Sequence, residues 1–195
     1  HYLEKPYRRE MLRTLVRIAV RESKEHHFLV SKIEKDIDSF AFMTRSEYEI
    51  RTLDDARVLT PFLAKMFPNP ESASSGIVEL LINAIEHGNL ALSYEEKSLL
   101  KWDGDWEAEI HRRLLLPQFA ERYATIHVEL AAHGVVFTIT DQGAGFDWQK
   151  YLSFDPCRAF DPNGRGIAMA KLTSFSDIEY HGKGNVVIAT VGHKP

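Results

Sequence analysis

The sequence predicts an α+β fold, a two-layer sandwich in which helices cover one face of a mixed β-sheet. Apolar residues recur at helical spacing between residues 53 and 89. Alternating apolar and polar residues predict strands in the last third of the chain, where a glycine-rich loop and a short amphipathic helix interrupt them. The predicted order is therefore helices, strands, one helix, and strands again.

The first predicted element is a long helix, or two helices, over residues 8–40. Apolar residues recur there every three or four positions from Leu12 to Phe40, with polar residues in the middle of the seam. This coiled-coil-like spacing predicts a linker that holds two chains together as a homodimer.

A strand and two helices are predicted next. Residues 46–51 alternate as a strand, and Asp54 or Asp55 is placed to cap the following helix. A Pro-Asn-Pro run at residues 68–70 ends that helix, and the next helix starts near Glu71.

Residues 90–123 are rich in Glu, Arg and Leu, and a Trp-Asp-Gly-Asp-Trp turn divides them into a predicted helical hairpin. Two strand hairpins complete the pattern. Their predicted strands are residues 125–130 with 135–140, and 177–181 with 185–191.

Composition excludes several classes of partner. The 195 residues carry a net charge of −4, so no basic footprint for nucleic acid or an anionic membrane is present. No run approaches the ~18 apolar residues of a membrane span. Cys157 is the only cysteine, which excludes an internal disulfide and fits a reducing cytoplasm.

The segment 76–89 is apolar on most sides except for one polar strip. Glu79, Asn83, Glu86 and His87 share this strip, because residues three or four apart stack on one helix face. A buried carboxylate and carboxamide need partners. A satisfied core network is one interpretation. The other is Mg²⁺ with phosphate, in which Asn83 holds the metal and Glu79 orients or deprotonates an attacking hydroxyl.

Two further motifs involve glycines. Asp141 ends a predicted strand and begins an Asp-x-Gly-x-Gly run. This run forms either an ordinary turn or a pocket in which the Asp141 carboxylate accepts a hydrogen bond from the adenine amine. At residues 161–172 a glycine-rich loop runs into an amphipathic helix. That loop is either a simple turn or a phosphate site at the helix N-terminus.

Together and in this order, the three segments resemble the N, G1 and G2 boxes of the GHKL ATPase superfamily, which includes gyrase, heat-shock chaperone, histidine kinase and mismatch-repair ATPases. The Glu-x-x-x-Asn-Ala-x-x-His-Gly-Asn form at residues 79–89 is most similar to the anti-sigma-factor serine kinases. The resemblance covers roughly residues 46–195. It implies a GHKL-type ATP-binding domain over residues 41–195, with residues 90–123 as a helical insertion.

The resemblance also implies ATP and Mg²⁺ as cofactors. Glu79 would be the general base, Asn83 the Mg²⁺ ligand, and Asp141 the group that reads adenine. The other residues implied at the nucleotide are His87, Gly143, Gly145, Gly164, Arg165, Gly166 and Ile167.

Residues 1–7 contain a Leu-x-Lys-Pro run that resembles the end of a response-regulator receiver domain. We therefore expect residues 1–7 to be a receiver remnant, and the chain to be part of a longer receiver–ATPase protein in bacterial signalling.

The function implied is a serine/threonine kinase that phosphorylates a hydroxyl on a small partner resembling an anti-sigma-factor antagonist. One alternative is a binding module that grips a sigma factor or antagonist and uses the nucleotide only to set its conformation; residues 90–123 offer a surface for this. The other is a histidine kinase catalytic domain. It is weakened because His26 and His27 lack the acidic residue and proline that usually follow a phosphorylated histidine.

Overall fold

The computed structural model describes residues 42–67, 69–131, 134–148 and 166–192. The predicted linker helix at 8–40 and the receiver remnant lie outside these residues, so both remain predictions. From Met43 onward, the described residues fall within one compact unit.

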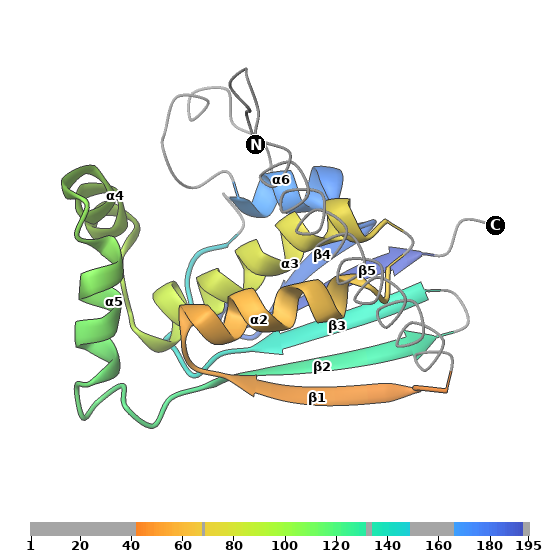
Figure 1. Cartoon of the computed structure of the whole chain (residues 1–195), viewed down its shortest axis with the longest axis horizontal. Helices are drawn as coiled ribbons and strands as arrows, with labels where there is room; N and C mark the ends of the chain where they lie inside the picture. The colour runs from red at the N-terminus through yellow and green to blue at the C-terminus, as the bar shows by residue number, and fades with distance from the viewer. Residues whose placement is uncertain (1–41, 68, 132–133, 149–165, 193–195) are drawn as a thin grey trace, which may run out of the picture. The chain divides into compact units, whose positions relative to one another are not determined.

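Five strands form one sheet in the order β1-β2-β3-β5-β4, and helices cover one of its faces (Figure 1). The predicted α+β two-layer class is therefore confirmed. The strands are β1 (Arg45–Ile50), β2 (Ala124–Ala131), β3 (Gly134–Thr140), β4 (Asp177–His181) and β5 (Val186–Gly192).

The sheet differs from the prediction in one respect, because every pairing among the described strands is antiparallel. A helix-containing crossover does connect β3 to β4, two strands that run in the same direction. They are not neighbours, however. β5 returns from β4 and inserts between them, pairing Phe137 with Ala189 and Ile178 with Ala189 on its two sides.

Three helices form the covering layer: α2 (Leu53–Ala64), α3 (Pro70–Asn83) and α6 (Gly166–Thr173). The central helix α3 packs against both α2 and α6. Alternate residues of β3, including Phe137 and Ile139, point into the core between the layers. The ring of Phe67 lies 4.9 Å from that of Phe137 and 6.0 Å from that of Phe175, which joins the end of α2 to the sheet.

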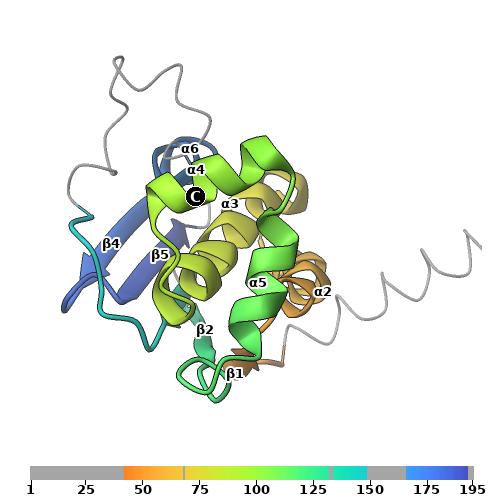
Figure 2. The ribbon, with the colours of Figure 1, turned by 90° about the vertical axis from the view of Figure 1, so that its left-hand side faces the viewer.

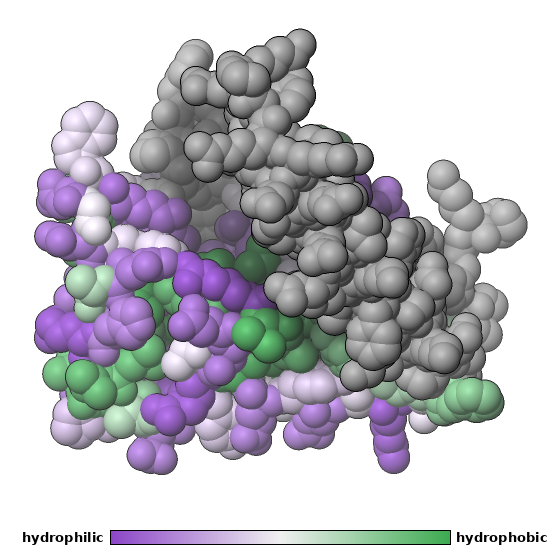
Figure 3. All heavy atoms as spheres, viewed as in Figure 1, coloured by the Kyte–Doolittle hydropathy of each residue, from purple (hydrophilic) through white to green (hydrophobic). Residues whose placement is uncertain are grey.

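Helix α2 begins two or three residues earlier than predicted. Its N-cap is Thr52, whose hydroxyl accepts from the Asp55 N–H while the Asp55 carboxylate accepts from the Thr52 N–H. Asp55 therefore supports the cap from the third helical position instead of being the cap itself. On the outer face, apolar side chains lie over α2 among hydrophilic ones (Figure 3), and Val58 is 77% exposed.

Helix α3 passes without a break into a π-helical turn, η1 (Ala84–Asn89). The predicted helical hairpin follows as α4 (Tyr94–Asp103) and α5 (Trp106–Leu114), beside the end of α3 (Figure 2). Gly104 makes the turn between them with φ of +83°, a conformation that glycine adopts without a Cβ penalty. Among the described helices, none has the length and apolar character needed to cross a membrane.

Candidate functional site

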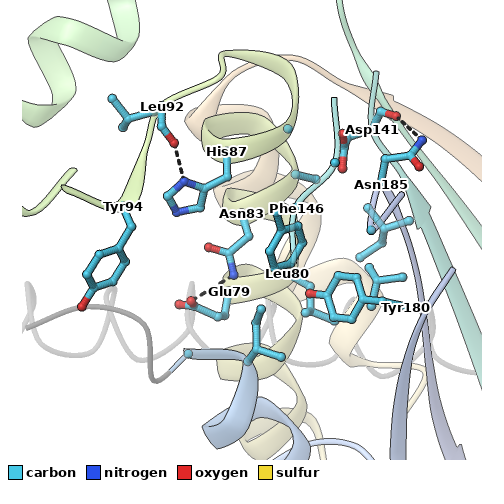
Figure 4. Close-up of a pocket in the computed structure, with 18 of the residues that line it drawn as sticks. Glu79, Leu80, Asn83, His87, Leu92, Tyr94, Asp141, Phe146, Tyr180 and Asn185 are labelled. Atoms are coloured by element: carbon cyan, nitrogen blue, oxygen red, sulfur yellow. Dashed lines mark hydrogen bonds between the residues drawn. The ribbon is translucent and has the colours of Figure 1, made fainter. Parts of the chain in front are cut away.

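A cavity of about 730 Å³ lies between α3–η1, α4, α6 and the ends of β3, β4 and β5 (Figure 4). Most of the predicted site residues line it: Glu79, Asn83, His87, Asp141, Gly145, Gly166 and Ile167. The fold thus brings three sequence segments, far apart along the chain, around one space. Gly164 and Arg165 lie outside the described residues.

Glu79 and Asn83 stand one helical turn apart on the cavity wall. The Asn83 Nδ2 donates to Glu79 Oε1 at 3.1 Å, so the carboxamide oxygen turns away from Glu79 (Figure 4). This orientation fits Mg²⁺, which takes oxygen ligands. Within the described residues, no cluster of three or more His, Cys, Asp or Glu side chains could hold a metal ion. A metal here would therefore need phosphate oxygens as further ligands.

His87 lies on η1, one turn beyond Asn83. Its Nδ1–H donates to the Leu92 carbonyl oxygen at 2.6 Å, which fixes the ring orientation and tautomer. Burial lowers the pKa of His87, and the charge of Lys97 adds to this effect. The ring is therefore neutral at pH 7. Its Nε2 carries a lone pair, so it can accept a hydrogen bond but cannot serve as a cation for phosphate.

Asp141 follows β3 at the other end of the cavity. Burial raises the pKa of its carboxyl to about 6, although the Gly143 N–H, which donates to Oδ1 at 2.8 Å, acts in the opposite direction. Its backbone is fixed on β5 as well, because the Asp141 N–H donates to the Asn185 carbonyl and Asn185 Nδ2 donates to the Asp141 carbonyl. At neutral pH this group is a partly buried, ionised acceptor held by rigid backbone.

Several glycines are required by close approach. A Cβ on Gly88 would overlap the Asp141 carboxylate, and one on Gly143 would overlap the Gly88 backbone. Gly143 is not among the residues that line the cavity, so it packs behind the wall. A Cβ on Gly166 would overlap the Glu79 carboxylate, which brings the start of α6 directly onto α3.

Gly145 has φ of +83°, and its backbone faces the Lys183 carbonyl. Both glycines of the Asp-x-Gly-x-Gly run are thus fixed by contacts beside the cavity. One packs on η1 and the other on the β4–β5 turn.

The sequence did not identify the aromatic wall at the Asp141 end. Tyr180 on β4 lines the cavity, and Phe146 packs edge-on against it with ring centroids 5.3 Å apart. Trp148 stacks on Tyr180 at 5.8 Å. Phe146 could have been predicted, because it directly follows the Asp-x-Gly-x-Gly run. Tyr180 could not, because only the order of strands in the sheet brings β4 to this site.

Glu86 departs from the predicted polar strip. Its side chain is fully buried, and its Oε2 lies 2.5 Å from Lys97 Nζ on α4. The cause is the π-helical turn, which shifts the helical register after Asn83 and turns Glu86 away from the cavity. Lys97 and Lys101 of α4 both line the cavity, so the helical hairpin reaches this site as well as offering a surface to a partner.

Comparison with known proteins supports the assignment of this cavity to a nucleotide-binding domain. A family model described as the histidine kinase-like ATPase domain matches residues 73–191. No curated protein matches the chain. The matched segment spans α3 to β5 and contains every described residue of the cavity wall. This chain therefore belongs to the histidine kinase-like ATPase domain family, whose domains bind ATP.

Proposed function

We propose that this protein is an ATP- and Mg²⁺-dependent serine/threonine kinase of the anti-sigma-factor type, acting in the cytoplasm. Its substrate would be a hydroxyl on a small protein that resembles an anti-sigma-factor antagonist. Adenine would lie at Asp141, between the glycine backbone and Tyr180, and the phosphates would lie toward Asn83, His87 and Gly166.

The observation that carries this proposal is the Glu79–Asn83 pair on the cavity wall. Asn83 would hold Mg²⁺ through its carboxamide oxygen, and the bound ion would neutralise charge on the phosphates. Glu79 is a carboxylate within the same cavity, fixed on one side by the Asn83 amide and on another by the start of α6. A protein that only bound the nucleotide would not need a base at this position.

In the proposed reaction the serine hydroxyl oxygen attacks the γ-phosphorus of ATP, and the bond from that phosphorus to the β–γ bridging oxygen breaks. The bridging oxygen leaves with its electron pair on ADP. Glu79 takes the hydroxyl proton. Phosphoryl transfer otherwise depends mainly on positioning and charge neutralisation, so the proton acceptor is the residue whose removal is most informative.

Replacing Glu79 with Gln tests this role. We expect single-turnover phosphoryl transfer to fall by roughly 10²–10⁴-fold, the usual contribution of a positioned base. ATP affinity should change little, because Asn83 and Asp141 remain. The matched control is Glu71→Gln on the same helix, an exposed carboxylate outside the cavity wall. Equal rates of phosphoryl transfer by the two variants would show that Glu79 has no catalytic role.

A nucleotide-dependent binding module is the second candidate. Apolar side chains on the helical hairpin are exposed, with Leu99 at 67%, Trp102 at 89% and Leu115 at 82%. Such a surface suits a protein partner. A wild-type chain that binds both ATP and the antagonist-like protein, yet transfers no labelled γ-phosphate in a single turnover, would establish this candidate over the kinase.

A further inference from the structure

We propose that the helical insertion completes the nucleotide site, with Lys97 and Lys101 of α4 binding the phosphate chain and Glu86 positioning Lys97. This inference rests on the proposed nucleotide site and assigns it two further ligands. It also gives residues 90–123 a role in nucleotide binding, in addition to any role in partner recognition.

The cavity wall has few cations to offer a nucleotide. Among the described lining residues the lysines and arginines are Lys97 and Lys101, and both lie on α4. His87 is neutral, because burial lowers its pKa. The described wall also contains two carboxylates, Glu79 and Asp141. ATP with Mg²⁺ still carries net negative charge, so the two α4 lysines are the described groups that can oppose it.

Lys97 is built into the site. Its side chain is only 8% exposed, yet it contributes to the cavity surface. Burying an ammonium group is costly unless a counter-charge compensates. Glu86, fully buried on η1, supplies that charge at 2.5 Å.

The ammonium has three N–H donors and the ion pair needs one, so Lys97 can stay on Glu86 and still donate to a phosphate. Moving to the phosphate instead would leave the Glu86 carboxylate buried without a counter-charge, so we expect Lys97 to keep both partners.

Lys101 lies one helical turn after Lys97, on the same face of α4. It is exposed, and its Nζ lies 5.0 Å from the centre of the Trp106 ring. The two lysines thus form a short row of positive charge from the buried cavity wall to solvent. A row of this kind suits an extended anion such as a triphosphate better than a single phosphate group.

The hairpin is attached firmly enough to serve as a wall. Arg113 on α5 donates to the carbonyl oxygens of Leu90 and Ala91, at 3.1 and 3.0 Å, immediately after η1. The same guanidinium pairs with Glu96 on α4 and Glu109 on α5, both at 2.7 Å. Arg113 therefore joins both helices of the hairpin to the end of the helix that carries Asn83.

Calorimetry with a series of ligands tests the proposal. We expect Lys101→Met to weaken binding of Mg²⁺-ATP by roughly tenfold, the value of one charge-assisted contact, and to leave adenosine binding unchanged. Lys97→Met alone strands a buried carboxylate. The second variant is therefore Lys97→Met with Glu86→Leu, since apolar replacement of a whole buried pair is often tolerated. It should lose ATP affinity by a similar factor and also keep adenosine.

Lys65→Met, at the end of α2 and outside the cavity wall, is the matched control and should bind both ligands normally. Unchanged ATP affinity in both α4 variants would overturn the inference while leaving the nucleotide site intact. Parallel loss of ATP and adenosine would also overturn it, because phosphate contacts cannot act on adenosine. A wild-type chain that binds neither ligand would instead refute the proposed site itself.

Discussion

The two ends of the cavity are built in different ways. At the Asp141 end, the wall combines glycine backbone with the rings of Phe146 and Tyr180. Gly88 and Gly145 on this wall, and Gly143 behind it, pack so closely that a Cβ on any of them would meet a neighbour. At the Glu79 end, helices form the surface, and the charged side chains on it are Glu79 of α3 and Lys97 and Lys101 of α4. Close packing therefore defines the Asp141 end of the cavity, and the charges of side chains define the Glu79 end.

This difference predicts different responses to mutation. A close-packed backbone has no room to adjust, so a single methyl group should displace whatever it touches. Charged side chains on helices can be exchanged without moving the backbone, so loss of Glu79 or Lys101 should change chemistry or affinity with little effect on folding. Lys97 is the exception, because its buried partner Glu86 must be replaced with it. Three substitutions and one control substitution sharpen this contrast.

Gly88→Ala should have the largest combined effect. Its Cβ would occupy the space of the Asp141 carboxylate, so either η1 or the segment after β3 must shift. We expect a loss of about 1–3 kcal/mol in unfolding free energy, together with weaker adenosine binding. Urea unfolding and calorimetry measure the two.

Gly104→Ala is the control for Gly88→Ala. At Gly104 the backbone φ is +83°, unlike at Gly88, and nothing lies within 4 Å of the added Cβ. Gly104→Ala should cost stability by about 1 kcal/mol and leave binding unchanged. If Gly88→Ala bound adenosine normally, shape would not specify this end.

Asp141→Asn should weaken adenine binding and stabilise the fold. The folded pKa of about 6 exceeds the ordinary 3.8, so ionisation opposes folding. The stabilisation that the protonated Asp141 carboxyl gives the wild-type fold is fully present below pH ~4. It is lost as the pH rises through 6, the folded-state pKa. At pH 7 the variant should be more stable by about 1–3 kcal/mol, with partial exposure reducing the value.

Urea unfolding of both proteins from pH 4 to pH 8 measures the effect of Asp141→Asn. Parallel stability curves would show that burial does not oppose ionisation of Asp141.

Thr52→Ala should have the smallest effect, because it lies at the N-cap of α2 and touches neither end of the cavity. Loss of the side-chain acceptor should cost about 1 kcal/mol. Nucleotide affinity should not change. A change in affinity would mean that the cavity responds to general loss of stability, and the contrast between its two ends could not then be tested by affinity alone.

Much of the fold follows from local patterns in the sequence. Alternation identified the strands, and the turn at Gly104 identified the hairpin, because both signals depend on neighbouring residues. The N-cap at Thr52 was missed, although a threonine three residues before an acidic residue is the pattern of a capping box. The antiparallel sheet was not visible, because strand order depends on which edge the last hairpin joins.

In the candidate site, too, the local patterns were predicted and the long-range arrangement was not. The polar strip correctly placed Glu79, Asn83 and His87 on one wall, but it assumed an unbroken α-helical register. The π-helical turn broke that register at Glu86. Lys97 and Lys101 could not be assigned from sequence, because their position depends on how the hairpin docks, through Arg113, against a segment some twenty residues earlier.

The position of β5 has a consequence for how the protein is made. Of the five described strands, β5 is the last to be synthesised, yet it pairs on both sides, with β3 and with β4. Until it leaves the ribosome, β3 has an open edge and β4 has no partner in the sheet. Asn185, which holds the Asp141 backbone, arrives with it. We therefore expect ATP to bind only after translation of the domain is complete, and a nascent chain that ends before Val186 to depend on chaperones.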